Sequence, residues 1–161
     1  MTRPARPSAK AVVVEEDRVL LNHMHHERVG DFYEFPGGGI QTGETLQQAV
    51  RREVREETGY AVNVHELLWV RDYIAANHAL AFLDPPGFHA VDLLFRCSLA
   101  GPAVAEAHES DNHQIGVEWI AAGRLRDIRL APAALVPLLE AFLSDRTVVR
   151  PIYLGDVGPS A

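Results

Sequence analysis

Residues 45–59, "TLQQAVRREVREETG", are the segment that most limits how this chain can fold. Thr45 followed three positions later by Gln48 matches a capping box, and Gly59 stands where helices commonly end. On a helix that turns by roughly 100° per residue, the aliphatic side chains of this segment fall on one narrow stripe. The segment is therefore predicted as an amphipathic helix with one buried face.

The glutamates of this helix are placed unusually. Glu57 falls inside the aliphatic arc, Glu53 lies at its edge, and Glu56 lies further round. A carboxylate on a buried face is unfavourable without a compensating partner, and like charges three or four positions apart repel. Pairing with the arginines of the same helix is the simplest explanation, but Glu57 faces away from them. A divalent cation such as Mg²⁺, which takes carboxylate oxygens, explains both the crowding and the placement.

The helix is preceded by the glycine-rich stretch "PGGGIQTGET". Residues 38–45 nearly fit the phosphate-binding pattern G-x-x-x-x-G-K-[ST], but Glu44 occupies the lysine position and reverses its charge, which argues against that function. Consecutive glycines indicate a backbone held in conformations closed to other residues. Such a loop could direct a carbonyl oxygen toward a cation on the following helix, whereas a flexible turn is the simpler alternative.

The remaining chain alternates between β-branched runs and turn signals, and strands outnumber helices. This order predicts a mixed sheet covered by helices, in the α/β class. The expected elements are a hairpin over 11–23, a short strand within 31–39 that stops at Pro36, strands over 61–74, 89–99 and 117–122, a loop or partly formed hairpin over 77–88, a helix over 132–145 that Pro137 kinks or whose start it shifts, and a strand or extended tail over 147–155.

Length and composition bound the function. The 161 residues suit one domain, taken as 11–155 with a flexible tail over 1–10 and a second tail over 156–161. The formal charge of −7 argues against sequence-independent binding of nucleic acid. A small anionic ligand would need a local source of positive charge. Cys97 is the only cysteine, which fits a reducing cytoplasm, and no apolar run is long enough to cross a bilayer. We therefore expect a cytoplasmic protein that binds a small molecule and binds neither nucleic acid nor a membrane. A homodimer is compatible with the sequence.

Residues 38–60 resemble the signature of the Nudix (MutT-like) hydrolases, G-x5-E-x7-R-E-U-x-E-E-x-G-U, where U is a bulky apolar residue. Val54 fits the first U and Tyr60 fits the second less well. The lead-in "YEFPGG" also resembles the family. Every fixed position of the signature is matched, by Gly38, Glu44, Arg52, Glu53, Glu56, Glu57 and Gly59.

The resemblance implies an α/β/α sandwich with a mixed sheet and hydrolysis of a nucleoside diphosphate linked to another group, with Mg²⁺ or Mn²⁺. A nucleotide sugar, an ADP-ribose-like compound, a dinucleoside polyphosphate and an oxidised or ordinary nucleoside triphosphate all fit. By position, the implied metal ligands are Glu53, Glu56 and Glu57 with the carbonyl of Gly37 or Gly38. Arg52 is implied as an orienting partner, paired with Glu44 or Glu56.

The general base is assigned less directly. Glu53 is the first choice, and the loop over 106–119 offers Glu109, Asp111 and His113 as alternatives for a base or a further ligand. Relatives often carry a glutamate shortly before the tryptophan of this loop, and His113 stands at that position here. A solvated acidic loop is the simpler interpretation of these residues.

Aromatic and charged residues outside the signature are candidates for substrate binding, because stacking and charge suit nucleotides. They are Tyr33, Phe35, Arg71, Tyr73 and His89, and ordinary packing is the alternative for each. Two other functions stay open: a nucleotide-sensing module that binds without turnover, and a scaffold with a structural Mg²⁺ site. Loss of a signature glutamate would favour the sensor, and none is lost.

Overall fold

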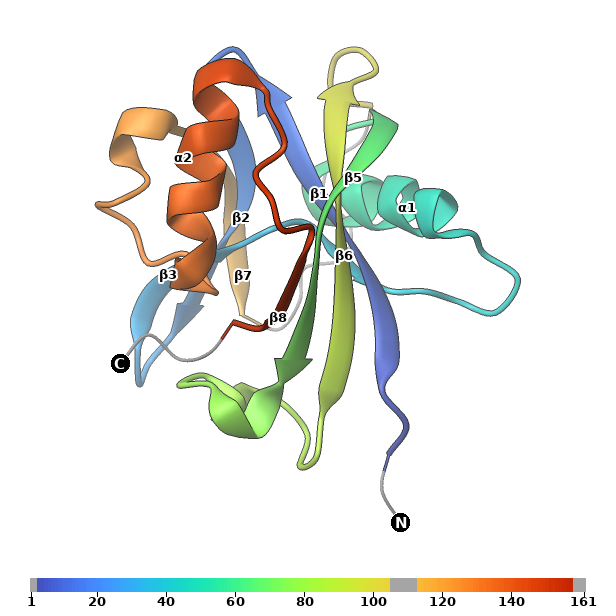
Figure 1. Cartoon of the computed structure of the whole chain (residues 1–161), viewed down its shortest axis with the longest axis vertical. Helices are drawn as coiled ribbons and strands as arrows, with labels where there is room; N and C mark the ends of the chain where they lie inside the picture. Colours follow the sequence, from blue (N-terminus) through green and yellow to red (C-terminus); the bar gives the residue numbers. More distant parts are fainter. Residues whose placement is uncertain (1–2, 105–112, 158–161) are drawn as a thin grey trace.

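A mixed sheet of eight strands forms the centre of the structure, a computed structural model that describes residues 3–104 and 113–157. The strands are β1 (Arg6–Glu15), β2 (Arg18–His26), β3 (Gly30–Glu34), β4 (Gly37–Gly39), β5 (Val62–Ile74), β6 (His89–Leu99), β7 (Gln114–Ala121) and β8 (Tyr153–Asp156). Helix α1 (Leu46–Thr58) covers one face and α2 (Val136–Asp145) the other (Figure 1). Single 3-10 turns lie at Ala75–Asn77, Ala81–Leu83, Ala122–Arg124 and Ala133–Leu135. The predicted α/β/α architecture is confirmed.

The strand order is β3-β2-β1-β6-β5-β8, with β4 paired to β1 and β7 paired to β2. The β1–β6 and β5–β8 pairs are parallel, and the other pairs are antiparallel. One edge of β1 is divided between two partners: residues 8–10 pair with β4, and residues 14–15 pair with β2. Strands β2 and β4 therefore leave β1 at different points, and the signature helix packs beside this division.

Alternating residues of β1 contribute to two separate cores. Ala11 and Val13 pack with the aliphatic stripe of α1, which includes Val50 and Val54. Val12 belongs to the core on the opposite face, which α2 closes with its buried leucines and phenylalanine. This period of two is what a strand buried on both faces requires.

Several local predictions are confirmed. Strands β1 and β2 form the expected hairpin, with Glu16 in the turn at φ 55°. The capping box is complete, because Gln48 N donates to Thr45 Oγ1 and Thr45 N donates to Gln48 Oε1. Gly59 ends α1 in the left-handed conformation at φ 76°. Pro137 lies in the first turn of α2, so it sets where the helix begins and does not kink it.

Other elements differ from the prediction. The glycines expected in a loop form β4, because pairing with residues 8–10 satisfies their backbone groups. Residues 6–10, assigned to a flexible tail, are instead the first part of β1 and pair with β6. Strand β7 begins earlier than predicted, and residues 75–88 contain two 3-10 turns. No helix within the described parts of the chain is long and apolar enough to span a membrane.

Candidate active site

Glu57 is the signature glutamate that reaches the interior. Its Oε2 accepts hydrogen bonds from Asn22 Nδ2 at 2.8 Å and from the backbone amide of Gly37 at 2.9 Å. The side chain thus bridges β2 and β4, the two strands that pair with different parts of the same edge of β1. Burial raises the pKa of Glu57 to about 7, although Lys10, Asn22 and the Gly37 amide act to lower it. A negative charge here is costly without a further cation, as its place on the helix wheel indicated.

Arg52 holds the other acidic residues of the signature. Its Nε and Nη2 donate to the two carboxylate oxygens of Glu44 at 2.6 and 3.0 Å. Its Nη1 donates to Glu53 at 2.8 Å and to Glu56 at 3.1 Å, and Nη2 also reaches the carbonyl of Gly39 at 3.2 Å. Both pairings that the resemblance implied for Arg52 are present. The hydrogen bonds from Arg52 lower the pKa of Glu44, so that carboxylate stays charged.

Two glycines of β4 are required by close approaches. A Cβ on Gly38 would lie 2.7 Å from Glu53 Oε1, so only glycine lets this carboxylate rest against the strand. Gly37 has φ 142°, and a Cβ there would lie 2.7 Å from the Cα of Lys10 on β1. The absence of side chains thus brings α1, β4 and β1 together around the carboxylates.

The signature carboxylates do not converge on one point. Across residues 3–104 and 113–157, no group of three or more His, Cys, Asp or Glu side chains is gathered so that it could hold a metal ion. Arg52 holds Glu53 and Glu56, whereas Glu57 is bonded to a backbone amide and an asparagine. The donor chemistry still fits Mg²⁺ or Mn²⁺, because these are hard oxygens on one helix face. The buried oxygen Asn22 Oδ1, beside Glu57, also lacks a hydrogen-bond partner within the described residues.

Lys10 is a functional candidate that the sequence reasoning missed. Its Nζ donates to the carbonyl of Gly37 at 3.2 Å. Burial acts to lower the pKa of Lys10, but the carboxylates of Asp92, Glu34 and Glu57 outweigh it, and the pKa ends above its ordinary value. Lys10 is therefore a charged ammonium beside the signature. A lysine within the small and aliphatic run "SAKAVVV" was the available signal.

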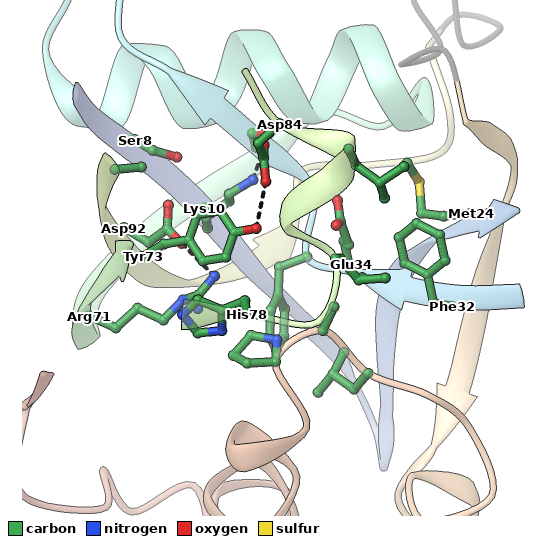
Figure 2. Close-up of a pocket in the computed structure, with 18 of the residues that line it drawn as sticks. Ser8, Lys10, Met24, Phe32, Glu34, Arg71, Tyr73, His78, Asp84 and Asp92 are labelled. Atoms are coloured by element: carbon green, nitrogen blue, oxygen red, sulfur yellow. Dashed lines mark hydrogen bonds and ion pairs between the residues drawn. The ribbon is translucent and has the colours of Figure 1, made fainter. Parts of the chain in front are cut away.

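A cavity of about 490 Å³ opens beside β4, on the sheet face opposite α1. Its polar floor comes from adjacent strands and includes Ser8, Lys10, Arg71, Tyr73 and Asp92 (Figure 2). Its apolar walls include Met24, Phe32, Leu80, Leu83 and Leu130. Backbone atoms of Gly37, Gly38 and Gly39 complete one end, so the cavity and the carboxylates share the same short strand.

Arg71 and Asp92 form a buried ion pair on the cavity floor, with Nη2 and Oδ2 at 2.8 Å. Arg71 is 8% exposed and Asp92 is 4% exposed. The second terminal nitrogen, Arg71 Nη1, is buried and finds no partner in the described residues. Nearby, Tyr73 donates its hydroxyl to Asp84 at 2.6 Å, and burial raises the pKa of Tyr73. The floor thus keeps a donor that an acceptor atom of a ligand could use.

Three of the five residues proposed for substrate binding line the cavity, namely Phe35, Arg71 and Tyr73. Tyr33 and His89 are not among its described lining residues. Tyr33 donates to Glu118 at 2.8 Å, and His89 contacts Asp72 at 3.2 Å. Because side chains alternate along a strand, the neighbours Phe32 and Ala90 face the cavity in their place.

The loop candidates for a general base remain predictions. Glu109 and Asp111 lie outside the described residues. His113 lines the cavity, and its carbonyl accepts from the amide of His25 at 2.8 Å. The following residue, Gln114, donates from Nε2 to the carbonyl of Glu57 at 2.9 Å. The segment after the loop is therefore attached to the end of the signature helix.

Comparison with known proteins gives a consistent result. The NUDIX domain model matches residues 4–142. A "MutT-like protein" of Streptomyces ambofaciens is 32% identical over 134 residues, which are 83% of this chain and 75% of that protein. An "ADP-ribose pyrophosphatase" of Methanocaldococcus jannaschii is 30% identical over 90 residues, 56% of this chain and 48% of that protein. This chain thus matches about half the length of the second relative.

Solved structures agree at the level of the fold. A NUDIX hydrolase from Nitrosomonas europaea has a TM-score of 0.66 and 19% sequence identity, and the match covers 96% of this chain and 79% of that one. The family model spans most of the chain, and the complete signature is folded around Glu57 and Arg52. The chain therefore belongs to the Nudix hydrolase family, whose enzymes act on phosphoric anhydride bonds.

Proposed function

We propose that this enzyme is a metal-dependent pyrophosphohydrolase that cleaves the diphosphate linkage of a nucleoside diphosphate joined to another group. The observation that carries the proposal is the position of Glu57. Its part-buried carboxylate accepts from the amide of Gly37, and the same glycine borders the cavity. A charge-bearing group is thus kept, at a cost in stability, where the phosphates of a bound substrate would lie.

The reaction adds water across the P–O–P linkage. The water oxygen bonds to one phosphorus, the bridging oxygen leaves with the other phosphate, and a base takes one proton. We assign the base to Glu53, which rests against Gly38 with its side chain 15% exposed. Arg52 positions Glu53 and Glu56 by hydrogen bonds.

Glu53, Glu56 and Glu57, with a carbonyl of Gly37 or Gly38, are the proposed ligands of Mg²⁺ or Mn²⁺. A bound divalent ion would neutralise the diphosphate and lower the pKa of the attacking water. Such an ion would also supply positive charge that a chain with a formal charge of −7 otherwise lacks.

The cavity is the proposed site for the part of the substrate beyond the cleaved linkage. Phe35 and Tyr73 offer aromatic surface, and Arg71 offers its unpartnered donor to a carbonyl, ring nitrogen or hydroxyl. The walls are apolar and the floor is charged, which suits a ring with polar edges. We propose a small nucleotide as the substrate, within the classes that the signature allows.

The test is phosphate release, direct or after phosphatase treatment, from a panel of nucleotide sugars, ADP-ribose, dinucleoside polyphosphates and nucleoside triphosphates. Each is assayed with Mg²⁺, with Mn²⁺ and with chelator. We expect turnover of one class that chelator abolishes. Metal-dependent binding by calorimetry without turnover of any compound would contradict the proposal and favour a nucleotide sensor.

A further inference from the structure

Lys10 is the only lysine in the chain, whose other strongly basic residues are all arginines. It lies in β1, directly across from Gly37 of β4 in the strand register. Its side chain lines the same cavity as Arg71 and Asp92 (Figure 2). An ammonium group at such a place needs negatively charged or polar partners in the protein or in a ligand.

One glycine joins Lys10 to the signature. The carbonyl of Gly37 accepts from Lys10 Nζ at 3.2 Å, and the amide of Gly37 donates to Glu57 Oε2 at 2.9 Å. Lys10 and Glu57 also interact electrostatically. Any cation that approaches the Gly37 carbonyl and Glu57 therefore meets the positive charge of Lys10.

Two arginines near Lys10 are already paired with carboxylates. Arg52 bonds three signature glutamates, and Arg71 is paired with Asp92. Lys10 differs because its compact charge sits on a flexible stem with three N–H donors, and its bond to Gly37 engages one of them. It can therefore bond a phosphate oxygen in the cavity as a point charge.

We propose that Lys10 is a phosphate-binding residue of this active site and that, without substrate, its charge opposes binding of the divalent ion. The inference rests on the proposed function and adds a residue outside the signature. Substrate phosphates would draw the ammonium away from Gly37 and Glu57, so that substrate and metal ion bind better together than apart. This order of events follows because the ammonium, which also lies near Asp92 and Glu34, would interact both with Glu57 and with the substrate phosphates.

The decisive test is Lys10→Met, which keeps the length of the side chain and removes its charge. Mn²⁺ affinity of the substrate-free protein, measured by calorimetry, should rise at least about threefold, because a like charge is lost. Affinity for a nucleotide analogue with a methylene-bridged diphosphate, measured with chelator present, should fall at least about tenfold. Arg96→Met, which removes one charge at the Glu66 pair on another part of the sheet, is the matched control and should change neither.

The two opposite shifts distinguish this role from a merely structural one. Lower Mn²⁺ affinity in Lys10→Met, or unchanged affinity for the analogue, would overturn the inference. Should Lys10→Met fail to fold, the wild-type protein still provides a test. Reductive methylation with ¹³C-formaldehyde gives a single lysine signal, which must shift when the analogue is added without metal ion; no shift would overturn the inference.

Failure of this inference can be separated from failure of the proposed function. If wild-type enzyme hydrolyses the panel and Lys10→Met keeps both wild-type affinities, only the role of Lys10 is lost. If no compound is hydrolysed but both affinities shift as expected, the role of Lys10 in binding holds, and the proposed hydrolysis is what fails.

Discussion

The carboxylate end of the site and the cavity beside it are built in different ways. The carboxylate end comes mainly from one continuous segment, residues 38–60, in which Arg52 bonds carboxylates eight or fewer positions away. The cavity is assembled from strands and loops that are distant in sequence, such as β1, β5 and β6. Chemistry that is common to a family can be encoded in a local segment, whereas the surface that selects a substrate can change without disturbing it.

The largest expected effect comes from Glu57→Gln. If Glu57 holds the metal ion, kcat should fall by at least about 100-fold, because a neutral amide is a much weaker ligand. Steady-state kinetics with Mg²⁺ would measure this change. Glu66→Gln, on the β5 surface where Glu66 pairs with Arg96, is the control and should keep wild-type kcat. Near wild-type turnover in Glu57→Gln would show that the carboxylate end does not take part in catalysis.

The same substitution should stabilise the metal-free protein. The folded-state pKa of Glu57, about 7, lies above the ordinary value of 4.5, so the folded protein favours the protonated form. Stability is therefore lost as pH rises from 4.5 to about 7, and the loss is complete above that range. The pKa shift of Glu57 corresponds to about 3 kcal/mol in the free energy of unfolding.

Urea unfolding with chelator at pH 5 and pH 8 would measure this difference. The free energy of unfolding of Glu57→Gln should clearly exceed that of the wild type at pH 8 and exceed it only slightly at pH 5. Glu66→Gln should show no gain, because Arg96 lowers the pKa of Glu66 and its charge is favourable in the folded state. An equal advantage of Glu57→Gln at both pH values would show that the charge of Glu57 is not the cause.

The cavity should respond differently. Arg71→Met leaves Asp92 buried without its partner, and we expect a stability loss of about 3 kcal/mol. The double variant Arg71→Met/Asp92→Leu removes both charges and should regain most of that stability. Both variants should still raise KM at least about tenfold, since the free donor of Arg71 is lost. Thermal unfolding measures the effect on stability, and kinetics measure the effect on substrate binding. A double variant with wild-type KM would exclude Arg71 from substrate binding.

The smallest effect is expected at His89. It contacts Asp72 beside the cavity without lining it, so His89→Ala should change KM by less than about twofold. Michaelis kinetics on the best substrate would detect a larger change. A tenfold rise in KM would show that the site extends beyond the cavity to the start of β6.

Sequence reasoning succeeded where the determining contacts are short in range. Thr45, Gln48 and Gly59 fix the ends of α1 through neighbours a few positions away, and the helix wheel placed Glu57 on the inner face. Strand β4 was missed because three glycines carry no strand signal, and only pairing with β1 creates that strand.

Long-range contacts were less accessible. Lys10 meets Gly37, and Arg71 meets Asp92, only through the registers of β1–β4 and β5–β6. A single sequence contains no information on which strands become neighbours. The residue types of the cavity could be proposed, but the alternation that turns Phe32 inward and Tyr33 away depends on where β3 pairs.

The most direct test of the account is kcat/KM across the whole nucleotide panel for wild type, Glu57→Gln and Arg71→Met/Asp92→Leu. If the carboxylate end performs the chemistry and the cavity selects the substrate, Glu57→Gln should lower every value by a similar factor and preserve the ranking. The double variant should reorder the ranking. A uniform loss in the double variant, or a new ranking in Glu57→Gln, would contradict this division of the site.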